Sequence, residues 1–380
     1  MSTKIEVLSS PSAQTVSTSG QHATVDLQFS LHRKQGVMVP LGIPNVKNQP
    51  SDPYFHFNYS IIQQAATTLI FEVRNVTGQL YYQSTIAQAY LQPGHYRLLW
   101  DGFDLADTFD SRCFNHKPLK ASLIVSGPQG SKTHSVFLTT RYQVVSWLDL
   151  LISRSQKRIN ITLRTNFKDG GAAAVHHQDL PTDDGRTKSF EELLLLAQDG
   201  LQYYWSRNQG HPVGKNIVLA DGNAYEVFVE AINTPVYAIK TPKIVYQSNA
   251  RLRRSRNWEL SRILFYNTGN LRHAKKWYTK KEAQANADYK LIAAHEIGHE
   301  ILLAYGGHIY SKSHKGSSTI LTQRPLGNYL YPAHGEIDLM LYYASYPKQP
   351  VLIDIHQRTI ASETDVKSLI WLAQIAYQLV

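Results

Sequence analysis

The stretch that decides the fold of the second half of the chain is LIAAHEIGHEILLAYGG, residues 291–307. It ends a longer run, residues 279–307, that is rich in strong helix formers, contains no proline and closes with two glycines. Thr279 stands three residues before Glu282, which is a capping-box pattern. We therefore expect a helix that starts near Thr279 and ends at the two glycines.

His295 and His299 are four residues apart, so both imidazoles project from one face of this helix. Two neutral imidazoles one turn apart present two nitrogens to a tetrahedral Zn²⁺, and Glu296 beside them has the chemistry of a general base. The pattern H-E-x-x-H on a helix is typical of zinc-dependent peptidases. We predict a Zn²⁺ site, although Mn²⁺ and Co²⁺ suit the same ligands. Gly298 inside the helix favours close approach of another segment.

The third ligand decides the kind of zinc site. Leu302 and Tyr305 stand where the longer pattern H-E-x-x-H-x-x-G-x-x-H has its glycine and third histidine, which excludes that subclass. We therefore predict Glu336, in YPAHGEIDLMLYY, as the third ligand. Glu363 follows Ser362 and is better explained as the first turn of a last helix. Three further side chains after the helix remain alternatives: Asp338, His308 and His314.

Peptide hydrolysis also requires a group that stabilises the developing oxyanion. The side chains after the helix with suitable chemistry are His314, Tyr331, Tyr342 and Tyr343. The sequence does not choose among them, and buried tyrosines are more often packing residues. We name His314 and Tyr331 as the candidate catalytic partners of Glu296.

Composition restricts the classes of protein that the chain can belong to. Of the 380 residues, 43% are hydrophobic, enough to bury the cores of two domains. Cys113 is the only cysteine, which excludes an internal disulfide and a cysteine-based zinc site. The start of the chain lacks the apolar core of a secretory signal, and no stretch reaches the ~20 apolar residues of a membrane-spanning helix. We expect a soluble chain with no membrane insertion.

The net charge of +10 is concentrated in two runs, RLRRSR at residues 251–256 and HAKKWYTKK at residues 273–281. A positive surface attracts anionic partners, such as an acidic protein or a cell envelope. No nucleic-acid-binding module is recognisable, so we expect no specific nucleic-acid partner. We interpret both runs as solvated basic faces.

The first part of the chain is expected to form an all-β domain. Residues 1–21 are rich in Ser and Thr and predict a flexible arm. Over residues 22–148, apolar and polar residues alternate between turns of Gly, Pro, Asn and Asp, which predicts a β-sandwich. The turn WDGFD, residues 100–104, resembles those of immunoglobulin-like domains.

After residue 148 helical and extended patterns alternate, so we expect an α+β domain over residues 149–380. A strand is expected at residues 158–167, and Ser189 has the position of a helix cap. Asp221 and Gly222 indicate a hairpin turn. We expect the helix at residues 189–206 to pack behind the histidine helix, and an edge strand to bind extended substrate.

Three segments carry a resemblance to a known family: AAHEIGHEILLAYGG, YSKSHKGSS and YPAHGEIDLMLYY. Together they resemble the zincin metallopeptidase toxin domains of bacterial type VI secretion effectors, over roughly residues 150–380. The resemblance implies a gluzincin-like zinc peptidase in which His295, His299 and Glu336 are ligands and Glu296 is the base. The fold that it implies is a multidomain α+β protein with a zincin-like second domain. The resemblance also implies that the immunoglobulin-like first domain, residues 22–148, serves docking or delivery.

The resemblance also implies where the protein acts. The chain would be made in the bacterial cytoplasm without a Sec signal, injected into a competitor and active in the periplasm of that cell. It would cleave a protein or a peptidoglycan peptide, associate with a secretion spike or tube component, and be neutralised by a cognate immunity protein. The alternative hypothesis is a non-catalytic protein that binds a partner or the envelope, with a structural metal site.

Overall fold

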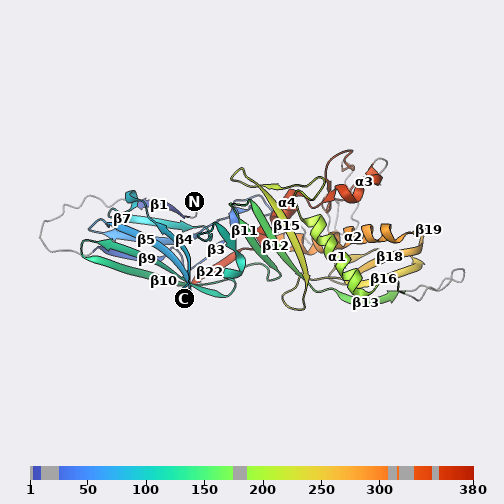
Figure 1. Cartoon of the computed structure of the whole chain (residues 1–380), viewed down its shortest axis with the longest axis horizontal. Coiled ribbons are helices and arrows are strands. Elements are labelled where there is room, and N and C mark those ends of the chain that lie inside the picture. The colour runs from blue at the N-terminus through green and yellow to red at the C-terminus, as the bar shows by residue number, and fades with distance from the viewer. Residues whose placement is uncertain (1–2, 10–24, 174–185, 307–314, 316–328, 345–350) are drawn as a thin grey trace.

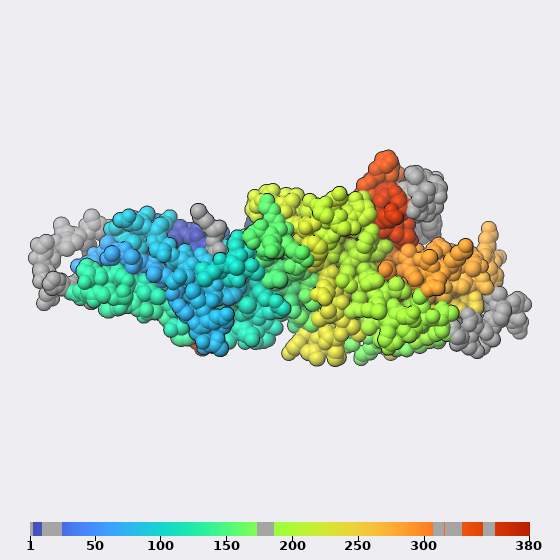
Figure 2. Space-filling view, in the orientation of Figure 1, coloured from blue at the N-terminus to red at the C-terminus, as the bar shows by residue number. Residues whose placement is uncertain are grey.

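The computed structural model describes residues 3–9, 25–173, 186–306, 315, 329–344 and 351–380. The molecule is elongated (Figures 1 and 2). A β-sandwich lies at one end and most of the helices lie at the other (Figure 1). It is a multidomain α+β protein built from several sheets, as expected. Among the described residues, none of the helices combines the length and apolarity needed to cross a membrane.

Two sheets form the sandwich. The first is antiparallel and has the order β1 (Thr3–Ser9), β7 (Gly94–Trp100), β4 (Phe55–Ile62) and β2 (Asp26–Leu31). The second has the order β3 (Gln35–Met38), β22 (Ile375–Leu379), β10 (Gly130–Tyr142), β9 (Lys117–Gly127), β5 (Thr68–Asn75) and β6 (Leu80–Thr85). Aromatic rings join the facing sides: Phe57 lies 5.4 Å from Phe71, and Tyr82 lies 5.9 Å from Trp100. The predicted sandwich is thus observed, and its core consists of alternate residues of both sheets.

The WDGFD turn is fixed by its own side chains. Trp100 is fully buried, and its indole N–H donates to the carbonyl of Phe103 at 3.0 Å. Asp101 accepts from the backbone N–H of Phe103 and pairs with Arg154 at 2.7 Å. Gly102 has a φ of 81°, which favours glycine. The ion pair between Asp101 and Arg154 therefore joins this turn of the sandwich to the β-hairpin of residues 148–165.

The last strand of the chain belongs to the first domain. β22 lies between β3 and β10 and is antiparallel to both. Ile375 is fully buried, and the ring of Tyr377 lies 4.8 Å from that of Phe55. The predicted second domain, residues 149–380, therefore does not include its last strand, which belongs to the sandwich. An amphipathic strand carries no signal in its own residues for the sheet in which it pairs.

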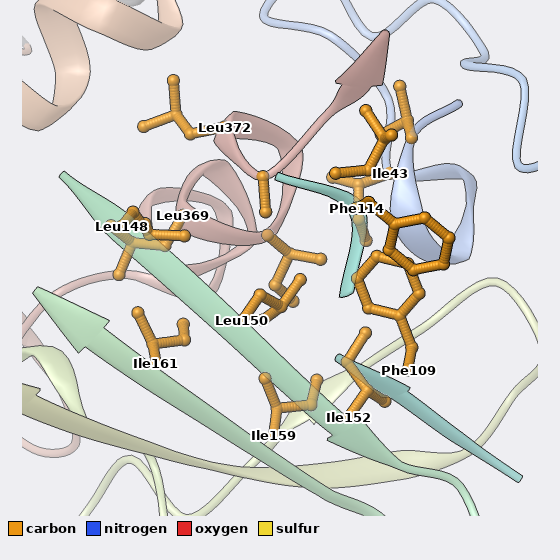
Figure 3. Packing of buried hydrophobic residues seen from close by; sticks show 14 of the residues in the cluster. Ile43, Phe109, Phe114, Leu148, Leu150, Ile152, Ile159, Ile161, Leu369 and Leu372 are labelled. Carbon is orange, nitrogen blue, oxygen red and sulfur yellow. The ribbon is translucent and has the colours of Figure 1, made fainter. Parts of the chain in front are cut away.

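A central sheet continues the structure away from the sandwich. Its order is β14 (Ile217–Val218), β15 (Ala224–Asn233), β12 (Arg158–Thr165), β11 (Leu148–Ser153) and β8 (Thr108–Asp110). Strand β8 comes from the sandwich segment of the chain, and α4 (Glu363–Leu372) packs nearby. Figure 3 shows the apolar residues of β11 and β12 meeting those of α4 and β8 in one core. This shared core joins the two ends of the molecule.

The far end carries a third sheet and the helices. The sheet has the order β13 (Lys168–Ala173), β16 (Lys243–Arg251), β18 (Ser261–His273) and β17 (Arg256–Trp258), and β19 (Lys276–Lys280) also pairs with β18. The helices are α1 (Phe190–Trp205), α2 (Glu282–Tyr305) and α3 (Val351–Arg358). A parallel pair, β20 (Ile337–Asp338) and β21 (Thr359–Ile360), lies beside them.

Helix α1 packs against α2, as predicted, and glycines allow the contact. Ser189 caps α1 in a capping box with Glu192. A Cβ on Gly200 would lie 2.2 Å from the carbonyl oxygen of Lys290 in α2. A Cβ on Gly298 would lie 2.4 Å from the sulfur of Met340, which confirms the predicted close approach there. The backbones of the two helices can therefore meet only where side chains are absent.

The start of the histidine helix differs from the prediction. Thr279 does not cap it, because Thr279 belongs to β19 and pairs with Asn270 of β18. Helix α2 begins at Glu282 after Lys281, which makes no side-chain cap hydrogen bond. The end is as predicted, since Gly306 adopts a left-handed conformation with a φ of 82°.

We predict that removal of residues 375–380 destabilises the sandwich, although they follow the whole second domain in sequence. The truncation removes buried Ile375 and Tyr377 and leaves β3 and β10 without the strand between them. We expect a loss of at least about 3–5 kcal/mol, the cost of truncating one large core side chain, because two such side chains and a paired strand are removed. Urea denaturation followed by tryptophan fluorescence measures it. Deletion of Val380 alone, which is 77% exposed, is the control; equal stability of both variants would refute the role of β22.

Candidate metal centre

The two histidines lie on one face of α2, as the spacing predicts. Their ring centroids are 4.9 Å apart, with the planes at 86° to each other. His299 is 3% exposed and His295 is partly buried. The helix thus brings two imidazoles together at the wall of a pocket, which is what two ligands of one metal ion require.

The tautomer of His295 follows from its neighbour. Its Nδ1 lies 2.8 Å from the carbonyl oxygen of Leu339, the residue that follows β20. A carbonyl only accepts, so Nδ1 carries the proton and Nε2 carries the lone pair. Burial also lowers the pKa of His295 below its usual range, which favours the neutral ring. A histidine that ligates a metal usually donates its other N–H in this way.

Glu296 is buried beside the two histidines. Its side chain is 7% exposed, and burial raises its pKa to about 8. A backbone hydrogen bond from Asn257 and the charges of Arg254 and Arg256 oppose that rise without cancelling it. Asn257 also donates its side-chain amide to the backbone carbonyl of Glu296 at 3.0 Å. Asn257 of β17 therefore fixes this turn of α2 to the third sheet.

Two neighbouring pockets open at this face of α2. The first has a volume of about 580 Å³, and its walls include His295, Glu296 and His299. The second, of about 540 Å³, includes His295 with Tyr331 and Tyr343. His295, Arg254, Ile292 and Tyr342 line both. A substrate that reaches His295 can therefore extend to either side of it.

One wall of the first pocket is basic. Arg253, Arg254 and Arg256 come from the segment between β16 and β18, and Lys280 ends β19. The two basic runs that we interpreted as solvated faces therefore meet at the candidate site. Sequence spacing gives no sign of this, because the parallel pairing of β16 with β18 brings the segment to the helix.

The structure does not bring Glu336 to the histidines. Both of its carboxylate oxygens accept from Arg207, at 2.6 and 3.0 Å, and it lines neither pocket. Arg207 is buried and also donates to the carbonyls of Asn216 and Ala361. The pair ties the end of α1 to the segment before β20. The geometry therefore gives no support to Glu336 as the third metal ligand.

The alternative ligand Asp338 is also engaged. Lys315 lies 2.5 Å from Asp338 and 2.5 Å from Asp365, and it contacts the hydroxyl of Ser362 at 3.2 Å. This cluster links β20 to the N-terminus of α4, where Ser362 is the cap, as predicted. Among the residues that the structure describes, no group of three His, Cys, Asp or Glu side chains is placed to hold a metal. The described donor set therefore fits two ligands of a zinc site and not the third.

The proposed oxyanion residues are only partly placed. Tyr331 stacks on Tyr343 with centroids 4.2 Å apart, and the hydroxyl of Tyr343 accepts from the backbone N–H of Asp338. Tyr342 is hydrogen-bonded to Arg254 at 3.2 Å and lines both pockets. His314 and His308 lie outside the described residues. Of the three candidate tyrosines, Tyr342 is thus the one that lines the pocket of Glu296.

Comparisons with known proteins add little. No protein-family model and no curated protein matches the sequence. Solved structures that match in part are β-glucuronidases, from Parabacteroides merdae (11% identity, 46% of this chain and 21% of that one, TM-score 0.18) and Bifidobacterium dentium (8% identity, 55% and 31%, TM-score 0.16). The chain spans a third or less of the length of these proteins. At such TM-scores the likeness supports no inference about fold or activity.

We predict that Glu336→Gln destabilises the protein and leaves its metal content unchanged. The substitution removes the ionic partner of buried Arg207; because Glu336 is 40% exposed, we expect a modest loss of about 1–2 kcal/mol. Urea denaturation and elemental analysis of the same preparation measure both quantities. Glu230→Gln is the control, since Glu230 is exposed. Loss of metal in Glu336→Gln alone would instead make Glu336 a ligand.

Proposed function

We propose that the chain is a zinc-dependent metallopeptidase. The observation that carries this is the placement of His295, Glu296 and His299 on one helical face at a pocket of about 580 Å³, with His295 fixed through Leu339 in the tautomer that a ligand needs. The buried carboxyl group of Glu296 lies at the same pocket wall as the two imidazoles. Its chemistry is that of a general base.

Each residue has a distinct role in this proposal. His295 and His299 hold the zinc ion, which when bound supplies Lewis-acid chemistry to the substrate carbonyl and to water. Glu296 accepts a proton from the attacking water and returns it to the leaving amine. The edge strand β17, which lines the same pocket, pairs with the extended substrate. Tyr342, which lines the same pocket, can donate its hydroxyl proton to the oxyanion.

Elemental analysis and a peptidase assay on the same variants test the proposal. We expect about one zinc per chain in the wild type and loss of zinc in His295→Ala and His299→Ala, because each removes a ligand. Glu296→Gln keeps the metal and loses about 10²–10⁴-fold in activity, because it lacks only the base. His308→Ala, His314→Ala and Asp338→Ala extend the search for the third ligand. A wild type without zinc after reconstitution, or a fully active Glu296→Gln, would contradict the proposal.

We propose in addition that this activity serves an antibacterial effector. The support is the resemblance of the three segments described above to type VI toxin domains, with the immunoglobulin-like sandwich as a docking module. The target would lie in the envelope of the recipient cell, and an immunity protein would protect the producer.

A growth experiment tests the effector proposal. Wild-type protein directed to the periplasm of a Gram-negative host by an added signal peptide should stop growth, because its target lies there. Glu296→Gln, directed in the same way, is the control that keeps the fold and lacks the base. The readout is the count of viable cells over time at matched expression. Equal growth of hosts carrying either protein would contradict the proposal.

A further inference from the structure

The arginines of the first pocket differ in environment from those that stabilise the fold. Arg253, Arg254 and Arg256 are exposed, and all three line the pocket that contains Glu296. None of them forms an ion pair with a carboxylate within the described part of the chain. By contrast, Arg207 and Arg262 of the same domain pair with Glu336 and Glu300.

The remaining charges of the pocket do not neutralise this wall. Lys280 is paired with Asp288 at 2.5 Å, so it adds no free charge. Among the described residues that line the pocket, Glu296 is the only carboxylate. Three arginines face at most one negative charge, which leaves an excess of at least +2 before any metal is bound. The positive potential of the pocket therefore attracts anions.

The backbone beneath the arginines is held in place. The N–H of Leu252 donates to the carbonyl of Arg272, and the amide of Asn267 donates to the carbonyl of Arg253. Ser255 accepts from the N–H of Phe265 at 2.9 Å. The arginines thus project from a fixed segment, so less order has to be imposed when they bind a ligand.

We propose that Arg253, Arg254 and Arg256 select peptides that carry carboxylates next to the scissile bond, which makes them specificity-determining residues of the site. Guanidinium groups bind carboxylates through two parallel N–H···O bonds, whereas a neutral amide offers no such match. Arg254 lies where the two pockets meet and therefore contacts residues close to the cleavage point. This inference rests on the proposed peptidase function, because it assigns the substrate of that same site.

A binding experiment tests it without requiring turnover. The full chain with Glu296→Gln is mixed with a fluorescein-labelled peptide that carries four glutamates, or with the same peptide in which they are glutamines. We expect the acidic peptide to bind at least about tenfold more tightly, and the difference to shrink in Arg254→Gln and Arg256→Gln and at high salt. Arg251→Gln is the matched control, because Arg251 is exposed in the same run and does not line the pocket.

Cleavage assays distinguish this inference from the function on which it rests. A zinc-containing wild type that cleaves both peptides equally well would overturn the anionic preference and leave the peptidase intact. Arginine-dependent binding of the acidic peptide without cleavage would support the binding site and count against the peptidase. An equally charged single-stranded oligonucleotide that displaces the acidic peptide at lower concentration, with the same arginine dependence, would overturn the assignment of a peptide. An equal effect of Arg251→Gln would also refute it.

Discussion

The candidate site depends on the close contact of α1 with α2. At Gly200 the backbones touch, because a single Cβ there would fall 2.2 Å from the carbonyl oxygen of Lys290. Trp205, fully buried, donates from its indole to the carbonyl of Ala294, the residue before His295. This hydrogen bond and the contact fix both the position and the rotation of α2. The direction in which the histidines point is therefore set by packing on the opposite side of the helix.

The contact between α1 and α2 is in turn supported by a core that continues along the whole molecule. From α2 the core continues through α4 to the central sheet, and the last strand then pairs inside the sandwich (Figure 1). The last strand of the chain, β22, completes a sheet of the sandwich, and β8 from the sandwich segment completes the central sheet, so each part contains a strand from the other segment of the chain. The stability of the candidate site at the far end therefore depends on the core of the whole molecule.

Short-range sequence patterns predicted much of this structure. The remaining features depend on contacts between segments that are far apart in the chain. Alternation predicted the sandwich strands, Ser189 the cap of α1, and the H-E-x-x-H spacing the shared face of His295 and His299. Thr279 satisfied a capping pattern and still became part of a strand, because pairing with β18 outweighed a single cap. Glu336 has ligand chemistry, but no sequence pattern reveals that buried Arg207 competes for it.

The charge distribution shows why such competition matters. Glu336 is paired with buried Arg207 near the end of α1, and Asp365 at the start of α4 is paired with half-buried Lys315, so these carboxylates contribute to the fold. In the pocket, by contrast, the cations are exposed and outnumber the carboxylates: three exposed arginines line it together with buried Glu296, the single carboxylate among its described lining residues. Pairing each of those arginines with a carboxylate of the chain would have gained little, because exposed pairs contribute ~1 kcal/mol or less. Left without such partners, they keep their charge for a ligand that enters beside Glu296.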